Sequence, residues 1–178
     1  MDSRGSEDTW GSSAMKTPLA TAFLLLAAAQ VSLAQGVANE PTISADAALE
    51  AASASLAFCR KEGGKVSVTV VDASGRVKAM VRDDGAAPHS AEHSMRKAYT
   101  ALTYRMPSAD YGKRAAEAKG VAIGPQLLPN ITTAAGGVPI KVGGVTVGAI
   151  GVSGTPSSAG GGAGDAKCAE AGLARIMK

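Results

Sequence analysis

The spacing of apolar residues changes several times after residue 43, and each change predicts a different element. Between Ser44 and Lys61 the apolar positions recur at helical spacing, which is typical of an amphipathic helix. We expect Ser44 to cap its start and Gly63-Gly64 to end it. The predicted buried stripe of this helix consists of Leu49, Ala52, Leu56 and Cys59.

Four later runs are rich in β-branched residues and have the length of strands. They are residues 66–71, 77–82, 138–142 and 145–152. Turn residues join the first two runs, and Gly143-Gly144 joins the last two in a tight hairpin that we expect to have positive φ angles. Residues 131–134 predict one further short strand.

Three more helices are predicted in the rest of the domain. The first covers residues 89–105, and the second begins at its cap Ser108 and reaches about Lys119. After a Gly/Ser loop over 154–164, Asp165 opens the last helix, which ends near Met177. Because no strand–helix–strand repeat occurs, the predicted fold class is α+β: an antiparallel sheet of about five strands with helices packed on it, in the order α-β-β-α-α-β-β-β-α.

The segment before the domain has the pattern of an export signal. Residues 15–34 contain a basic start at Lys16, an apolar run, and small residues at the positions that a signal peptidase reads, which predicts cleavage between Ala34 and Gln35. The alternative is an uncleaved membrane anchor, for which the apolar run is short. Residues 1–14 are acidic, unlike a signal start, so we expect translation to begin at Met15, or else a disordered extension.

These boundaries predict four parts of the chain. Residues 1–14 are the extension, 15–34 the signal peptide, 35–43 a polar linker, and 44–178 the folded domain. The predicted location is periplasmic or secreted.

Composition limits the function classes. The net charge is only +3 and aromatic residues make up 3% of the chain, with no basic patch interleaved with aromatics, so nucleic-acid binding is not expected. The small side chains bury little area each, so we expect the monomer to have modest stability, and association into a homo-oligomer would offset that low stability.

Two cysteines occur, Cys59 in the first predicted helix and Cys168 in the last. In an oxidising compartment two cysteines favour a disulfide, and the loop that it would close is nearly the whole domain. The alternative is two separate buried thiols. No Cys-x-x-Cys motif is present, so redox chemistry of the thioredoxin type is not supported.

The two histidines of the chain, His89 and His93, lie four residues apart on the helix predicted over 89–105. A helical wheel places the core face at Ala91, Met95, Ala98 and Leu102. The opposite face, which is predicted to point away from the core, carries His89, His93, Lys97, Thr100 and Tyr104.

Such a face fits a ligand groove or a subunit interface. Imidazole is a good ligand for iron or zinc, and Arg96 or Lys97 can pair with carboxylates. The alternative is a solvated face with two incidental histidines. A zinc site has less support, because no third ligand is evident beyond Asp83 or Asp84.

The glycine-rich segment 148–154 is not a dinucleotide fingerprint, because a long loop rather than a helix follows it. It is not a phosphate-binding loop, because it lacks Gly-Lys-Ser/Thr, and it is not a nucleophile elbow, because the spacing differs and no histidine follows Ser153. We interpret Gly148 and Gly151 as strand positions where another backbone approaches closely. A mobile lid formed by Ser153-Gly154 and the following loop is the alternative for that part.

Several segments occurring together and in order resemble the GlcG/HbpS family of haem-binding, haem-degrading domains, which is also related to the C-terminal part of PduO-type proteins. They read VTVVDASG (68–75), DGA (84–86), RKAYTA (96–101), GGVPI (136–140) and GAIGVSG (148–154), followed by Asp165 and Cys168-Ala169. The resemblance covers residues 44–177, nearly all of the predicted mature chain.

The resemblance implies an antiparallel sheet with helices, a homo-oligomer that is often an octamer, and haem as cofactor, in one case with a membrane sensor protein as partner. His89 or His93 would be the axial iron ligand, Arg96 or Lys97 would meet a propionate, and Thr100 would line the site.

The function predicted is therefore an exported haem-binding protein that senses or handles haem. One alternative is a structural or partner-binding oligomer without haem. The other is an enzyme acting on haem or on a small carboxylate. The sequence shows no nucleophile–base pair, so we expect at most weak peroxidatic or haem-degrading activity.

Overall fold

The computed structural model describes residue 36 and residues 38–118 and 128–177. The predicted signal peptide, its cleavage site and Lys119 lie outside the described residues. The chain divides into residues 1–38 and a compact unit of residues 39–178. Among the residues that the structure describes, no helix has the length and apolar character needed to cross a membrane.

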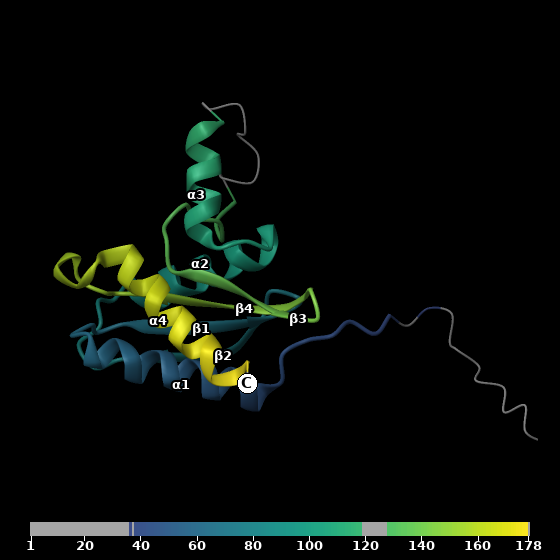
Figure 1. The fold of residues 1–178 in the computed structure, drawn as a ribbon, viewed down its shortest axis with the longest axis horizontal. Coiled ribbons are helices and arrows are strands. Elements are labelled where there is room, and N and C mark those ends of the chain that lie inside the picture. Colours follow the sequence, from purple (N-terminus) through teal and green to yellow (C-terminus); the bar gives the residue numbers. More distant parts are fainter. Residues whose placement is uncertain (1–35, 37, 119–127, 178) are drawn as a thin grey trace, which may run out of the picture. The chain divides into compact units, whose positions relative to one another are not determined.

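The unit is an α+β domain, as predicted, and its sheet has four strands. Its elements are α1 (Ala45–Lys61), β1 (Ser67–Asp72), β2 (Val77–Arg82), α2 (Ser90–Tyr104), α3 (Ser108–Glu117), β3 (Gly137–Val142), β4 (Val145–Ser153), the short 3-10 helix η2 (Ser157–Ala159) and α4 (Gly161–Ile176). All neighbouring strands pair antiparallel in the order β2-β1-β4-β3 (Figure 1).

The strand predicted over residues 131–134 is not present. The backbone N–H of Thr132 donates to Thr100 Oγ1 at 2.9 Å, so a side chain of α2 takes the place of a neighbouring strand.

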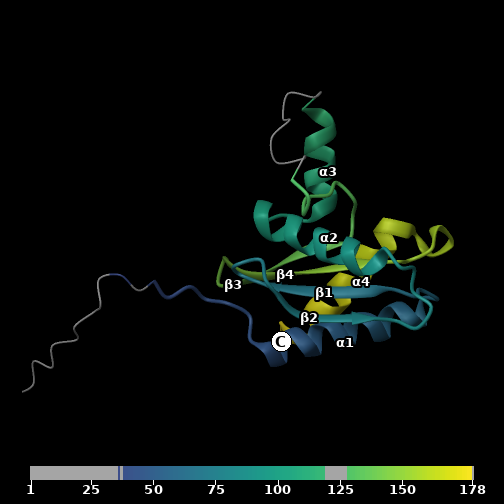
Figure 2. The same cartoon turned by 180° about the vertical axis from the view of Figure 1, so that it is seen from behind.

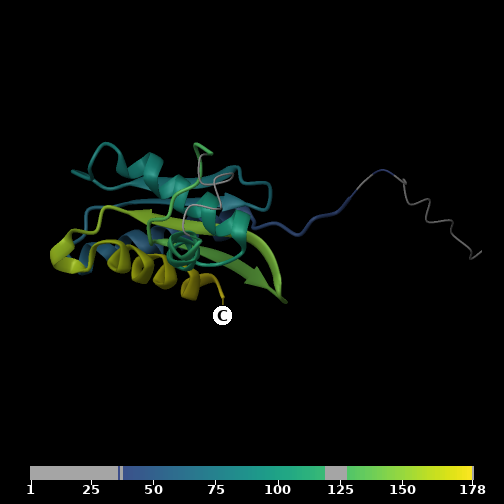
Figure 3. The same ribbon diagram turned by 90° about the horizontal axis from the view of Figure 1, so that it is seen from above.

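Helices cover both faces of the sheet. Helices α1 and α4 pack against each other on one face, and α2 crosses the other face over β1, β4 and β3 (Figures 1 and 2). Figure 3 shows these layers from above, with α2 and α4 on opposite sides of the strands.

The face under α1 and α4 holds the larger apolar core. Its buried members are mainly Val, Ile, Ala and the two cysteines, including Val66, Val68, Val70, Ile140, Ile150, Val152 and Ala169. The stripe predicted for α1 is correct at Ala52 and Cys59, but Leu49 is 52% exposed, and Ala48, Ala51 and Ser55 are buried instead. The helix contacts its neighbours through small side chains, since α4 approaches it closely at Gly172.

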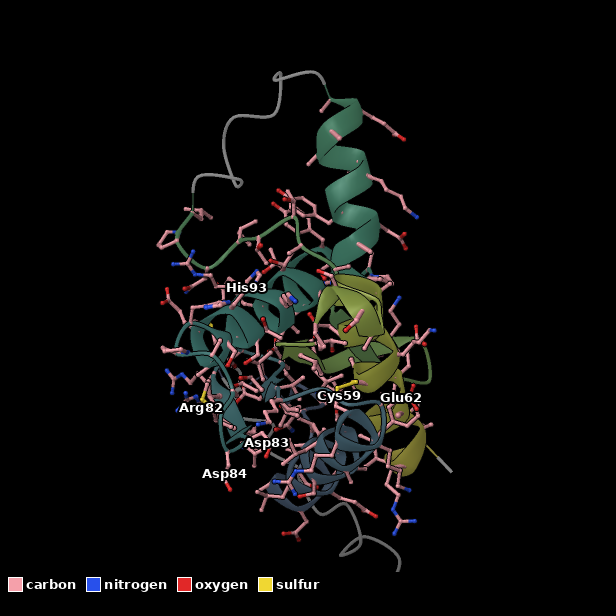
Figure 4. The ribbon with its side chains drawn as sticks, turned by 90° about the vertical axis from the view of Figure 1, so that its left-hand side faces the viewer. Cys59, Glu62, Arg82, Asp83, Asp84 and His93 are labelled. Atoms are coloured by element: carbon pink, nitrogen blue, oxygen red, sulfur yellow. A yellow bond between two sulfur atoms is a disulfide. The ribbon has the colours of Figure 1, made fainter. Side chains whose placement is uncertain are left out.

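A disulfide joins Cys59 of α1 to Cys168 of α4 across a sequence separation of 109 residues (Figure 4). The pairing predicted from the sequence is confirmed. The bond links the two helices that cover the same face of the sheet.

The face under α2 is built differently, because its contacts are small or polar. Ser67 Oγ and Ser90 Oγ are 2.8 Å apart, and Thr69 Oγ1 and Ser94 Oγ are 2.7 Å apart. A Cβ atom on Gly151 would lie 2.1 Å from the carbonyl oxygen of Ser94, so the backbone of α2 rests directly on the strand. This confirms the interpretation of Gly151 as a position of close backbone approach.

Several boundaries agree with the sequence and two differ. Ser44 Oγ accepts from the N–H of Ala47, as a cap should, and Gly143 and Gly144 have φ angles of 57° and 83° in the β3–β4 turn. Ser108 is the first residue of α3 rather than its cap, because its hydroxyl donates to the carbonyl of Ala134. Helix α4 begins at Gly161, within the predicted loop, so Asp165 lies in its second turn.

Candidate functional site

A cavity of about 370 Å³ lies between α2, the end of β4 and the start of α4. We call it the inner cavity. It is lined by Ala87, His89, His93, Lys97, Ala134, Ser153, Gly154, Thr155, Gly162 and Asp165.

A buried ion pair lies in the wall of the inner cavity. Lys97 Nζ donates to Asp165 Oδ2 at 2.7 Å, and the two side chains are only 3% and 5% exposed. The other carboxylate oxygen, Oδ1, accepts the backbone N–H of Thr155 at 2.9 Å. Burial lowers the pKa of Lys97, and Asp165 opposes that shift by favouring the ammonium form.

Gly136 and the first residue of β3, Gly137, leave room for this pair. A Cβ atom on Gly136 would lie 2.8 Å from the Cβ atom of Asp165 and 3.1 Å from Cδ of Lys97. A Cβ atom on Gly137 would lie 2.1 Å from the carbonyl oxygen of Lys97. The Gly136-Gly137 backbone therefore packs directly on Lys97, which explains why a lysine at this position is buried.

His93 lies at the edge of the inner cavity and is half-buried (Figure 4). Its Nδ1 is 3.2 Å from Ser153 Oγ, and its Nε2 is 3.4 Å from Thr132 Oγ1. Burial, followed by the neighbouring charge of Lys97, lowers the pKa of His93 below its usual value of 6.5. The imidazole is therefore neutral at pH 7, with one nitrogen as donor and the other as acceptor.

A second, smaller hollow of about 210 Å³ lies along α2, and we call it the outer hollow. It is lined by His89, Glu92, His93 and Arg96. His89 is exposed, and within the described part of the chain no hydrogen bond to its imidazole occurs. Arg96 Nη2 donates to Glu92 Oε1 at 2.5 Å, whereas Arg96 Nε is buried without a partner in the described residues.

The predicted outward face of this helix is wrong at two positions. Lys97 and Thr100 are buried, while Ser90, Ser94 and Ala101 join Ala98 in facing the protein interior. The actual inner face is therefore rotated toward Lys97, because small side chains and glycines allow the helix to approach the sheet closely.

The other predicted positions divide between the two spaces. His89 and His93 line both the inner cavity and the outer hollow, and their ring centroids are 6.5 Å apart. Arg96 lines the outer hollow but not the inner cavity. Thr100 lines neither: its hydroxyl donates to the carbonyl of Arg96 and accepts from Thr132 N–H, which fixes the segment beside His93.

The sequence interpretation missed Ser153, Thr155 and Asp165 as residues of one site. Ser153 is 60 residues from His93, and Asp165 is 68 residues from Lys97. One available signal was the spacing of Asp165 and Cys168, which puts them one turn apart on α4 and therefore on the same side of that helix.

No group of three residues able to hold a metal ion occurs among the residues that the structure describes. Asp83, considered above as a third zinc ligand, is bound by Arg60 at 2.8 Å. Figure 4 shows it well apart from His93. A metal site here would have to rely on the two histidines and on ligands from elsewhere.

The fold and the site define a small α+β domain in which two histidines on one helix lie beside a polar, partly enclosed cavity. The chain belongs to the HbpS-like family, described as haem-degrading proteins, whose family model matches residues 43–174.

Known relatives agree with this assignment. The protein GlcG of Escherichia coli K12 is 35% identical over 94 residues, which cover 53% of this chain and 68% of GlcG. The crystal structure of a double mutant of HbpS from Streptomyces reticuli is 34% identical, with a TM-score of 0.72 over 80% of this chain and 91% of that chain. A solved complex of PduOC with haem is 22% identical and shares the fold, with a TM-score of 0.67 over 76% of this chain and 96% of that chain.

Proposed function

We propose that this protein is an exported haem-binding protein that senses or handles haem, and that it binds haem over the outer hollow with His89 as the axial ligand. The proposal is supported by membership of a family described as haem-degrading and by the haem complex of PduOC, which has the same fold. The observation that carries the residue assignment is the exposed imidazole of His89 beside this hollow.

The two histidines differ in their availability to iron. Both nitrogens of His93 lie within hydrogen-bond distance of hydroxyl groups, Ser153 Oγ and Thr132 Oγ1. In the described residues His89 has no such contact, so its ring nitrogens are free to coordinate a metal. A bound haem would supply an iron centre for ligand binding and redox change.

The donor set around His89 also fits the acidic edge of a porphyrin. Arg96 Nε is a buried guanidinium donor without a partner in the described residues, and a propionate would satisfy it. Glu92 already neutralises part of the Arg96 charge through its contact with Nη2, so we expect Arg96 to bind a single carboxylate of the ligand.

The size of the two spaces limits how haem is placed. Neither the outer hollow nor the inner cavity, at about 210 and 370 Å³, encloses a porphyrin, which is a broad flat ring. Haem would therefore lie across the surface beside His89, and its second face would need cover. We propose that a second subunit of a homo-oligomer, with an octamer as one possibility, provides this cover.

Titration of the full chain with hemin tests the proposal. We expect a shifted Soret band at a defined stoichiometry, and we expect the His89→Ala variant to lose it or to give the spectrum of a different axial ligand. The matched variant His93→Ala should keep the wild-type band position, because His93 is engaged by Ser153 and Thr132.

An unchanged Soret band in His89→Ala would contradict the assignment of His89, and the absence of any hemin-dependent band would contradict haem binding altogether. Analytical ultracentrifugation in the same samples tests the oligomer. Assembly without hemin uptake would instead favour a structural or partner-binding role. N-terminal sequencing of material from the periplasm or medium tests export, with a mature chain beginning near Gln35 as the expected result.

A further inference from the structure

We propose that the inner cavity is a binding site for a small carboxylate, with Lys97 as the charged donor and Ser153 and His93 as its neighbours. The two histidines line both this cavity and the outer hollow, but Lys97 and Ser153 line the inner cavity alone, and the inference does not depend on haem binding.

Lys97 supplies hydrogen-bond donors that the protein leaves unused. An ammonium group carries three N–H donors. In the described residues Nζ makes one hydrogen bond, to Asp165 Oδ2. Since the side chain is 3% exposed, its other donors cannot be satisfied by bulk water, and an unpaired buried donor of a charged group is costly. A ligand that brings acceptor oxygens into the inner cavity would relieve that cost.

Asp165 does not compete for the same ligand. Both of its oxygens are already bonded, Oδ2 to Lys97 and Oδ1 to the N–H of Thr155. A cation in the cavity would have to share a carboxylate that is already paired, and it would face the Lys97 ammonium at close range. The charge arrangement therefore favours an anion over a cation.

Ser153 and His93 add a second polar contact to the wall. The Ser153 hydroxyl is buried and lies 3.2 Å from Nδ1 of His93. A hydroxyl both donates and accepts. The Ser153 hydroxyl can therefore donate to a ligand oxygen while it accepts a hydrogen bond from Nδ1–H of His93. A carboxylate, with two oxygens in one plane, can reach Lys97 through one and Ser153 through the other.

The volume restricts the rest of the ligand. Sites for small molecules usually measure about 300–1,000 Å³, and the inner cavity lies at the lower end of that range. The remaining wall is formed by small side chains such as Ala87, Ala134 and Gly162, which offer no further charge. We infer a compact organic acid with one carboxylate.

The experiment is a titration of the full chain with acetate, followed through the histidine ring signals in a carbon–proton NMR spectrum. The chain has only two histidines, so the His89→Ala variant assigns both sets of signals. We expect acetate to shift the His93 signals along a saturating curve. Acetamide, which has the same shape without the charge, should bind about tenfold more weakly or worse.

Two variants test the residues. Lys97→Met/Asp165→Asn removes both charges while keeping an acceptor for the N–H of Thr155, and it should abolish the saturating shift. Ser153→Ala keeps the ion pair, and so it remains informative if the double variant fails to fold. It should weaken acetate binding several-fold. Lys141→Met removes an exposed lysine and should leave acetate binding unchanged.

Three results would overturn the inference: no saturating shift of His93, equal binding of acetamide and acetate, or unchanged acetate binding in both site variants. A carboxylate could also reach Lys97 as a haem propionate. Acetate that displaces hemin would identify that source, whereas simultaneous binding would identify a free small carboxylate.

The two proposals fail separately. Arg96→Met, at a residue that lines the outer hollow and not the inner cavity, should weaken hemin binding and keep acetate binding. If acetate binds while hemin does not, the haem assignment fails alone. If hemin binds and acetate does not, the carboxylate site fails alone.

Discussion

The two faces of the sheet bury different chemistry, although the same strands contribute to both. Under α1 and α4 the contacts are between aliphatic side chains, and a disulfide links the two helices. Under α2 the contacts are between hydroxyls, glycines and a buried ion pair, with only a small apolar cluster around Val71 and Ala98. The first face supplies most of the apolar burial, whereas the second brings polar groups of α2 up to the strands. The inner cavity and the outer hollow both lie along α2, on the polar side.

Breaking the ion pair should have the largest effect. Lys97→Met leaves the Asp165 carboxylate buried without its cation, and we expect the free energy of unfolding to fall by about 3–5 kcal/mol. Urea denaturation measures this. The double variant Lys97→Met/Asp165→Asn should recover much of the loss, and a single-variant cost below about 1 kcal/mol would show that the pair is not buried in solution.

Removing the disulfide tests the other face. Cys59→Ala/Cys168→Ala frees a loop of 109 residues, and we expect a loss of about 2–4 kcal/mol. Thermal unfolding of the variant should match that of wild-type protein treated with a strong reductant. Equal Tm values for oxidised and reduced wild type would be inconsistent with a stabilising bond.

Adding one methyl group between α2 and the sheet should cost somewhat less. In Gly151→Ala the new Cβ would lie 2.1 Å from the carbonyl oxygen of Ser94 and 2.5 Å from the amide nitrogen of Ala98. Helix α2 must shift, and we expect a loss of about 1–3 kcal/mol in urea denaturation together with altered His93 NMR signals. Gly36→Ala, where a Cβ meets nothing within 4 Å, is the control and should be neutral.

A reciprocal exchange on neighbouring strand residues compares the faces directly. Thr69→Val removes a hydroxyl contact under α2 and should cost about 1 kcal/mol, because Ser94 keeps its bond to the carbonyl of Ala91. Val70→Thr places a hydroxyl in the aliphatic core and should cost about 1–3 kcal/mol in the same assay. A smaller cost for Val70→Thr than for Thr69→Val would show that the two faces do not differ in their tolerance of hydroxyl groups.

The smallest effect concerns pH. Burial lowers the folded-state pKa of His93 below 6.5, so the unfolded chain takes up a proton first as the pH falls. Stability from this residue is therefore present above pH 6.5 and is lost as the pH falls through that value toward the lower folded pKa. The free energy of unfolding should decline less between pH 7 and pH 5 in His93→Gln, and parallel curves would contradict the assignment.

The sequence predicted the aliphatic face better than the polar one, for a physical reason. Hydrophobic period predicted the strands 66–71 and 145–152, turn chemistry predicted the Gly143-Gly144 turn, and the expected oxidising compartment predicted the cysteine pairing. All are present, with strand ends that differ by one residue. These features depend on local patterns or on a small number of possible partners.

The residues buried on the polar face cannot be predicted from the hydrophobic period of the sequence. A helical wheel based on apolar residues predicted that Met95 and Leu102 lie on the buried face of α2. In the structure the buried positions include Ser90, Ser94 and Lys97. The burial of Lys97 depends on Asp165, 68 residues later, and on the space left by Gly136-Gly137. The period of one helix contains no information about either.

The pairing of β1 with β4 at the centre of the sheet has a consequence for how the protein reaches its native state. Ser67 aligns with Ser153, so the first strand of the chain finds its inner neighbour only after the last strand is available. Contacts of such long sequence separation slow folding. The inner cavity is lined by α2, the end of β4 and the start of α4, which this pairing helps to bring together. Ligand binding in the inner cavity therefore reports on completed folding, and a nascent chain released before α4 would have β-hairpins but no inner cavity.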